Sequence, residues 1–210
     1  MERLPVSINK TNLFRLEDEL SFAKDGLELL DEKKEILITQ ITALASKAEL
    51  ARSKMTEALE RTYEHLREAV ATHGIVNCAK AAQAASMGEE VAVKERSFMG
   101  VALPVVTVKI PAMTPSYGFH GTGAAMDTVV KDIHDSMPAI AELAEMEVSL
   151  FLLTAEIKKT IRRINALNNI YIPAYEATIK HIEESLEEKE REFLFQLKRR
   201  KGFQGEADHE

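Results

Sequence analysis

The sequence contains no tryptophan and one cysteine, and aromatic residues make up only 6% of it. Nine glycines and six prolines are spread over 210 residues. Such scarcity of large rings and chain breakers argues against a thick globular core. The abundant residues are Ala, Leu, Ile, Glu and Lys, which favour helix. We therefore expect an elongated, mostly helical protein.

Neither sign of charge is in large excess. The chain carries 34 acidic and 27 basic residues, a formal net charge of -7, with both signs interspersed. This balance argues against binding of a nucleic-acid backbone as the main role. The longest apolar run near the middle, Leu150–Leu153, is far below the ~20 residues of a membrane-spanning helix. We expect neither nucleic-acid binding nor a membrane span.

A targeting segment and a disulfide are also missing. The polar start MERLPVSINK lacks the apolar core of a signal peptide. Cys78 alone cannot form an intramolecular disulfide, and it is interpreted as a small packing residue. These features predict a reducing cytoplasm as the location.

Motifs for catalysis, cofactors or metals do not stand out. No G-x-x-x-x-G-K-[ST] pattern occurs, and the glycines at 118, 121 and 123 lack the lysine and the strand-to-helix context of a phosphate site. The six histidines form no H-E-x-x-H pair. The sequence therefore predicts no catalytic residue, no cofactor and no metal site.

The N-terminal third has a sustained heptad pattern. Alternating steps of three and four reach Leu13, Leu16, Leu20, Ala23, Leu27, Leu30, Lys34, Leu37, Ile41, Leu44, Ala48, Ala51, Met55, Ala58, Thr62 and His65. Most of these residues are apolar, which is typical of a coiled-coil seam. The polar members interrupt the seam and fix its register. At ~1.5 Å per residue the helix would be roughly 80 Å long, capped at its start by Asn9, Thr11 or Asn12.

A second stripe in the C-terminal half provides a partner helix. Its positions are Ile157, Ile161, Ile164, Asn168, Tyr171, Tyr175, Ile179, Ile182, Leu186, Glu190, Phe193 and Leu197. We expect helix from about Asp127 to Lys201, with a bend or local break at Pro138 and at Pro173. Folding the chain back at its middle would pair Leu13–Leu20 with Glu190–Leu197.

The middle of the chain differs from both helical segments in composition. Two valine-rich runs, EVAVKERSF and VALPVVTVKIP, flank Met99 and Gly100 and indicate a β-hairpin in which Pro104 is tolerable only at an edge. The stretch 111–123 then reads as a loop. The expected fold is mostly α, a long antiparallel two-helix coiled coil with a small β-hairpin segment at the bend. The expected divisions are 1–75, 76–125 and 126–210.

One segment resembles a known family. The run AEIKKTIRRINALNNIYIPAYEATIKHIEESLEEKEREFLFQLKRRK resembles the C-terminal signature of the D subunit of V/A-type rotary ATPases. The matching residues are Glu156, Ile157, Lys159, Thr160, Arg162, Arg163, Ile164, Asn165, Ala166, Leu167, Ile172 and Pro173. The N-terminal helix is similar to the family's at Gly26, Leu29, Leu30 and Lys33. It departs from the family at residues 7–11, where many members have a Pro-Thr-Arg/Lys run.

The resemblance implies a non-catalytic rotor shaft of a proton- or sodium-translocating ATPase or ATP synthase. In the family, both termini enter the bore of the catalytic head hexamer, formed by the A and B subunits. The bend binds the small F subunit and the membrane-side funnel subunit, of the C/d type. Such a shaft is cytoplasmic and peripheral to the membrane.

Two basic segments are candidates for partner contacts. Arg162 and Arg163, together with Asn165 in the same run, form either a solvated face or a contact with acidic loops of the head. The four residues Lys198, Arg199, Arg200 and Lys201 form either a cationic helix end that complements the macrodipole or a basic tip in the bore.

Two other kinds of protein fit parts of the pattern. A prefoldin-like chaperone also joins two long helices through β-hairpins, but such chains are usually shorter and lack the Arg162–Pro173 signature. An F-type rotor subunit would carry a larger α/β domain between its helices than the ~50 residues available here.

Overall fold

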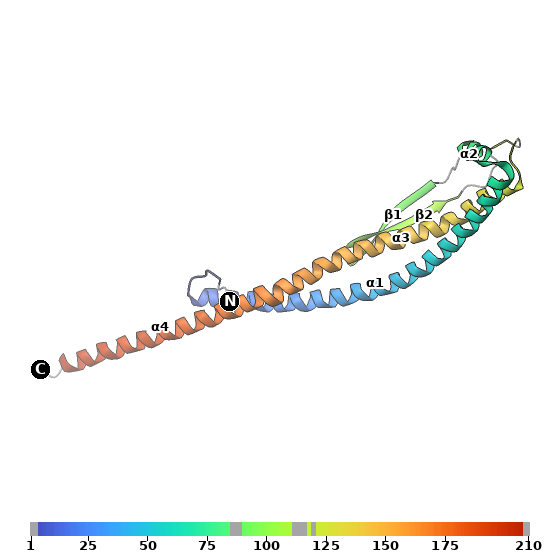
Figure 1. The fold of residues 1–210 in the computed structure, drawn as a ribbon. Coiled ribbons are helices and arrows are strands. Elements are labelled where there is room, and N and C mark those ends of the chain that lie inside the picture. The colour runs from blue at the N-terminus through green and yellow to red at the C-terminus, as the bar shows by residue number, and fades with distance from the viewer. Residues whose placement is uncertain (1–3, 85–89, 111–116, 119–120, 208–210) are drawn as a thin grey trace. The chain divides into compact units, whose positions relative to one another are not determined.

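The computed structural model describes residues 4–84, 90–110, 117–118 and 121–207, with side chains up to Arg200 (Figure 1). The elements are α1 (Lys10–His73), α2 (Ile75–Ala84), β1 (Glu90–Phe98), β2 (Val101–Lys109), α3 (Ala124–Ala166), the π-helix η1 (Leu167–Tyr171) and α4 (Ile172–Ala207). The expected long helices with a small antiparallel sheet between them are confirmed. The chain divides into two compact units, Met1–Glu35 with Lys158–Glu210, and Ile36–Ile157.

Helix α1 has a defined signal at each end. Asn9 caps its start, since the Asn12 backbone N–H donates to Asn9 Oδ1 at 2.7 Å. At its end Gly74 has a φ of 79°, and its N–H donates to the Val70 carbonyl at 2.9 Å. A left-handed glycine after the last helical residue is a common helix stop. The expectation of a cap at the start is confirmed, with Asn9 as the residue that provides it.

The heptad stripe of α1 is its buried face. All sixteen expected positions are buried or half-buried, and none is exposed. Leu16 and Leu37 have 1% and 0% of their surface accessible. Each fully buried leucine contributes about 1.5–3 kcal/mol, so the seam is what stabilises so long a helix.

In the first unit, α1 and α4 run antiparallel. Lys24 Nζ lies 2.9 Å from Glu176 Oε1, and Lys10 Nζ lies 3.0 Å from Glu190 Oε1. The expected pairing of Leu13–Leu20 with Glu190–Leu197 is therefore wrong by more than a heptad. In this register the first residue of α1, Lys10, already lies beside Glu190, so the part of α4 beyond Glu190 has no opposing turn of α1.

The π-helix η1 shifts the second stripe by one residue. The Ile172 N–H donates to the Leu167 carbonyl, and the next residue, Pro173, has no N–H to continue the ordinary ladder. This wider turn buries Ile172 and leaves Tyr171 51% exposed. The expected seam positions Asn168 and Tyr171 are thus wrong, while the local break at Pro173 is confirmed. Helix α3, in contrast, continues through Pro138.

In the second unit, α1 packs against α3. Arg52 Nη2 lies 2.6 Å from Glu147 Oε1, and His65 Nδ1 contacts Asp132 Oδ2. The buried polar residues of α3 in this unit, Ser136 and Ser149, are small. Small side chains at a helix interface let the two backbones approach closely.

The hairpin packs beside this helix pair (Figure 1). Leu103 on β2 is 2% exposed and lies in one cluster with Leu37 of α1 and Leu153 of α3. A two-stranded hairpin is marginal on its own in water, so these contacts hold it in place. The hairpin therefore reaches back along the helices rather than forming a separate cap.

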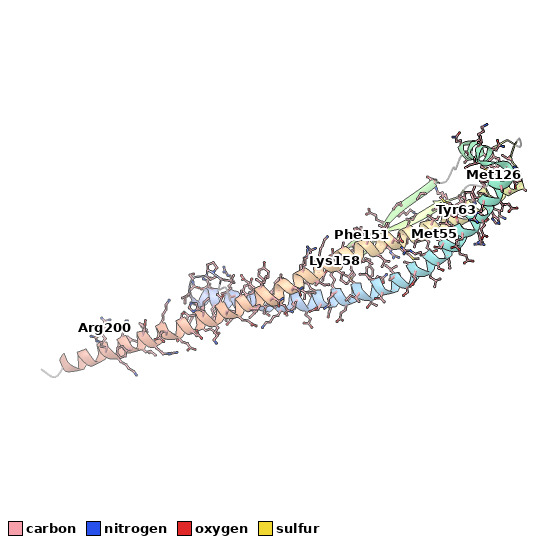
Figure 2. The ribbon with its side chains drawn as sticks, viewed as in Figure 1. Met55, Tyr63, Met126, Phe151, Lys158 and Arg200 are labelled. Atoms are coloured by element: carbon pink, nitrogen blue, oxygen red, sulfur yellow. The ribbon has the colours of Figure 1, made fainter. Side chains whose placement is uncertain are left out.

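A second cluster lies where α1, α2 and α3 meet. Its buried members are Ala69, Cys78, Ala81, Met126 and Val129. Cys78 is a free, buried cysteine, which confirms its interpretation as a packing residue. Met126 is labelled in this region in Figure 2.

Candidate partner interfaces

The end of α4 presents exposed apolar and aromatic side chains. Phe193, Leu194, Phe195 and Leu197 are between 43% and 69% exposed. The expectation that Phe193 and Leu197 belong to the seam is wrong, because Lys10 already lies beside Glu190 at the first turn of α1. A shallow apolar recess on this part of α4 is lined by Leu186, Lys189, Glu190, Phe193 and Leu194. Clustered exposed apolar side chains commonly mark a binding surface.

The basic residues that follow are also exposed. Lys198, Arg199 and Arg200 project from α4, where Figure 2 labels Arg200. Lys201 belongs to α4, but its side chain lies outside the described residues. Helix α4 continues to Ala207 and has no basic residue in its last turn. The macrodipole acts only within the last turn, so it does not account for these four cations.

The arginine pair lies on the outer face of the last turns of α3. Arg162, Arg163 and Asn165 are exposed, while Ile164 between them is 7% exposed. The Arg162 Nε–H donates to the Lys158 carbonyl of its own helix at 3.2 Å, which leaves the rest of the guanidinium available. Beyond this pair, the π-helix turns Ile170 outward, and that side chain is 63% exposed. The two kinds of residue give this segment mixed cationic and apolar character.

The hairpin has one covered face and one open face. Phe98, Val101 and Leu103 pack toward the helices. On the other face Val91 pairs with Val108 and Val93 with Val106. Val91 and Val93 are 54% and 63% exposed. Runs of consecutive apolar residues, Val91–Val93 in β1 and Val105–Val106 in β2, place apolar side chains on both faces of the hairpin rather than on one.

The meeting point of α1, α2 and α3 holds a phenol–carboxylate pair. Tyr117 Oη–H donates to Asp127 Oδ1 at 2.5 Å. Burial, and to a smaller extent the hydrogen bond and the negative charge of Asp127, together raise the pKa of Tyr117 to about 12. Within the described ranges, no group of three or more His, Cys, Asp or Glu side chains is placed to hold a metal ion. None of the helices that the structure describes is long and apolar enough to cross a membrane.

Comparison with known proteins agrees with the resemblance found in the sequence. The family model described as the ATP synthase D subunit matches residues 12–202. The chain belongs to the family of ATP synthase D subunits. It is 35% identical over 196 residues to an A-type ATP synthase D subunit of Methanopyrus kandleri, covering 92% of this chain and 84% of the relative. The A-type D subunit of Pyrococcus furiosus is 35% identical over 201 residues, 94% of each chain.

Family membership separates this chain from the chaperone and the F-type rotor. A third relative, the A-type D subunit of Thermococcus sibiricus, is 32% identical over 199 residues and covers 93% of each chain. The match extends over the hairpin and both long helical segments of the chain.

Proposed function

We propose that this D subunit is the central shaft of a rotary ATP synthase, which transmits torque between a catalytic head and a membrane ring without an active site of its own. The observation that carries the proposal is the seam of α1, in which all sixteen heptad positions are buried or half-buried. A shaft must resist bending, and a helix held along its whole length by a partner does so better than an isolated one.

The free end of α4 is proposed to enter the bore of the head hexamer of A and B subunits. Its exposed Phe193, Leu194 and Phe195 provide an apolar surface, and Lys198–Arg200 follow at once with positive charge. Arg162, Arg163 and Asn165 are proposed to meet acidic loops of the same head. Cations on both segments suit an acidic partner, because opposite charges steer association.

The hairpin and the α1–α2 turn are proposed to carry the partners on the membrane side, which are the F subunit and the funnel subunit. The open valine face supports this assignment, since exposed β-branched residues on a sheet favour a partner. The chain would then be cytoplasmic and peripheral to the membrane as part of the complex.

A reversible crosslink tests the rotor role. Cys78→Ser removes the native thiol, and Lys198→Cys places a new one on the exposed end of α4. In the assembled complex, a disulfide from this position to a cysteine in the bore should stop continuous ATP hydrolysis, and a reductant should restore it. If the crosslinked complex hydrolyses ATP at its full continuous rate, the chain does not turn relative to the head.

The orientation has its own test. Truncation after Glu190 removes the exposed end of α4 beyond the Lys10–Glu190 contact. Binding to the isolated A–B hexamer should fall strongly while binding of the F subunit persists. A matched control, Val91→Ser in the hairpin, should leave head binding unchanged. If the truncated chain lost only its binding to the F subunit, the ends would be assigned the wrong way round.

A further inference from the structure

The outer edges of β1 and β2 differ in whether their outward backbone groups have hydrogen-bond partners. In the β1–β2 ladder Phe98 pairs with Val101 across the Met99–Gly100 turn, and both turn residues have positive φ. Such a two-residue turn is closed by a hydrogen-bonded pair. Hydrogen-bonded and non-hydrogen-bonded pairs then alternate along the ladder. The Glu95–Pro104 and Val93–Val106 pairs are therefore of the second kind, with their backbone groups directed outward.

The outward edge of β2 is occupied. Its Val106 N–H donates to Glu145 Oε2 of α3 at 2.8 Å. Pro104, two residues earlier on the same edge, has no N–H to satisfy. The proline and the helix together block this edge against another strand, as edges in natural sheets commonly are. The expectation that Pro104 sits at an edge is confirmed.

The outward edge of β1 has no such protection. Val91, Val93, Glu95 and Ser97 all belong to non-hydrogen-bonded pairs of the ladder, so their backbone N–H and C=O groups point away from β2. Across the described ranges, no hydrogen bond from another segment reaches these four backbones. The strand has nine residues, without proline; Ala92 and Phe98 are half-buried and the other seven are exposed. An edge of this length and exposure accepts a further strand readily.

The exposed side chains of β1 indicate which residues a third strand beside it would have. Lys94 and Arg96 lie on the face of Phe98, and neither forms an ion pair with another described residue. Val91 and Val93 lie on the opposite face and are exposed. Directly opposed side chains on neighbouring strands interact, and like charges destabilise the pair. The complementary strand therefore has acidic residues on one face and β-branched apolar residues on the other.

We propose that the free edge of β1 binds an extended segment of a partner subunit as a third strand, with acidic residues facing Lys94 and Arg96 and apolar residues facing Val91 and Val93. This inference rests on the proposed function, because it specifies how the hairpin holds a partner in the complex. It adds the mode of binding, through backbone hydrogen bonds at an edge rather than through packing on the valine face alone.

Hydrogen–deuterium exchange of the assembled ATP synthase against the isolated chain is the direct test. Strand addition should slow exchange in the peptide that spans Val91–Ser97 by about tenfold or more, because its outward amides become hydrogen-bonded. A helix lying on the valine face would leave those amides free. Unchanged exchange in an assembled complex overturns the strand proposal and leaves the shaft role intact. Failure of the chain to assemble overturns both.

A pair of proline variants isolates the edge. Val93→Pro removes one outward N–H and keeps the ladder with β2, because position 93 is in a non-hydrogen-bonded pair. Ala102→Pro makes the same change on the opposite, α3-facing edge and serves as the control. We expect Val93→Pro to weaken binding of the membrane-side partner by about tenfold, whereas Ala102→Pro changes it less than about twofold. Equal effects from the two variants would contradict the proposal.

Charge reversal tests the identity of the strand. Lys94→Glu with Arg96→Glu should weaken partner binding and reduce its salt dependence, since the complementary acidic residues would then face like charge. Unchanged affinity would contradict the acidic face. Sedimentation of the isolated chain gives a further check. If the chain forms a dimer that Val93→Pro abolishes, the third strand comes from a second copy of this chain. That result would contradict binding of a segment from a different subunit.

Discussion

Lys10 Nζ lies 3.0 Å from Glu190 Oε1, so the first turn of α1 is already opposite a residue well before the end of α4. Both side chains are more than 60% exposed. Exposed pairs of this kind contribute about 0–1 kcal/mol, so the contact reports the register of the two helices rather than stabilising them. The same register places Lys24 beside Glu176.

The register predicts which cysteine pairs crosslink. In a Cys78→Ser background, Lys24→Cys with Glu176→Cys should react within one chain with a short bismaleimide, because the native side chains meet at 2.9 Å. Leu16→Cys with Phe193→Cys should react far more slowly, since Phe193 lies beyond the start of α1. Mass spectrometry of tryptic fragments measures both yields. Efficient crosslinking of the second pair alone would refute the register.

Leu103 is predicted to be the hairpin residue with the largest effect on stability. It is 2% exposed and lies with Leu37 and Leu153 in one cluster. Leu103→Ala should lower the free energy of unfolding by about 2–5 kcal/mol, the usual range for a buried leucine. Val91→Ala, at a side chain 54% exposed, should cost below about 0.5 kcal/mol. Urea unfolding followed by circular dichroism compares them, and equal losses would contradict this packing.

The same packing predicts that deleting the hairpin would disturb the helices. A flexible linker in place of Glu90–Ile110 would uncover Leu37, which is 0% exposed. The valine-rich segment is too small for its own core, as its length predicts. Helix α1 in turn depends on the hairpin, because Leu103 of the hairpin packs in one cluster with Leu37. Point substitutions on the open face therefore separate partner binding from stability better than a deletion does.

Much of the fold follows from local rules that act over a few residues. The α1 seam was predictable because a 3.5-residue period repeated over many turns leaves little ambiguity. The hairpin was predictable from two valine-rich runs around Met99–Gly100, and the position of Pro104 from its missing N–H. In each case one physical requirement, burial of a stripe or satisfaction of a donor, decides the outcome.

The parts that sequence did not predict depend on relations between distant residues. Counting turns past Pro173 assumes an ordinary helix, but η1 inserts one residue and exchanges Tyr171 for Ile172 at the buried face. The register depends on packing between distant segments, and with Lys10 beside Glu190 the helix that begins after Asn9 does not reach Phe193. The candidate residues Arg162 and Arg163 are exposed as a contact surface requires, and the head proposed as their partner is formed by other chains.

Two glycines on or beside α1 should respond oppositely to alanine. Gly26 lies inside α1 with open space where a Cβ would stand, so Gly26→Ala should stabilise the chain by about 0.5–1 kcal/mol. Gly74 has a φ of 79°, a conformation that alanine adopts with strain, so Gly74→Ala should destabilise it by about 1 kcal/mol or more. Thermal unfolding of both variants is the measurement. A stabilising Gly74→Ala would contradict the left-handed helix stop.

Tyr117 should make stability fall at high pH. Its pKa is raised from 10.0 to about 12 by burial, and by the hydrogen bond and charge of Asp127. A raised pKa in the folded state means that its contribution is complete below pH 10 and is lost as pH rises toward about 12, because the unfolded chain releases this proton first. The difference in unfolding free energy between the native chain and Tyr117→Phe should therefore shrink or reverse across that window. Tyr63→Phe, at a side chain 63% exposed, is the matched control for removal of one phenol hydroxyl. If the unfolding free energies of the native chain and Tyr117→Phe changed in parallel with pH, the Tyr117 phenol would not be donating the hydrogen bond to Asp127.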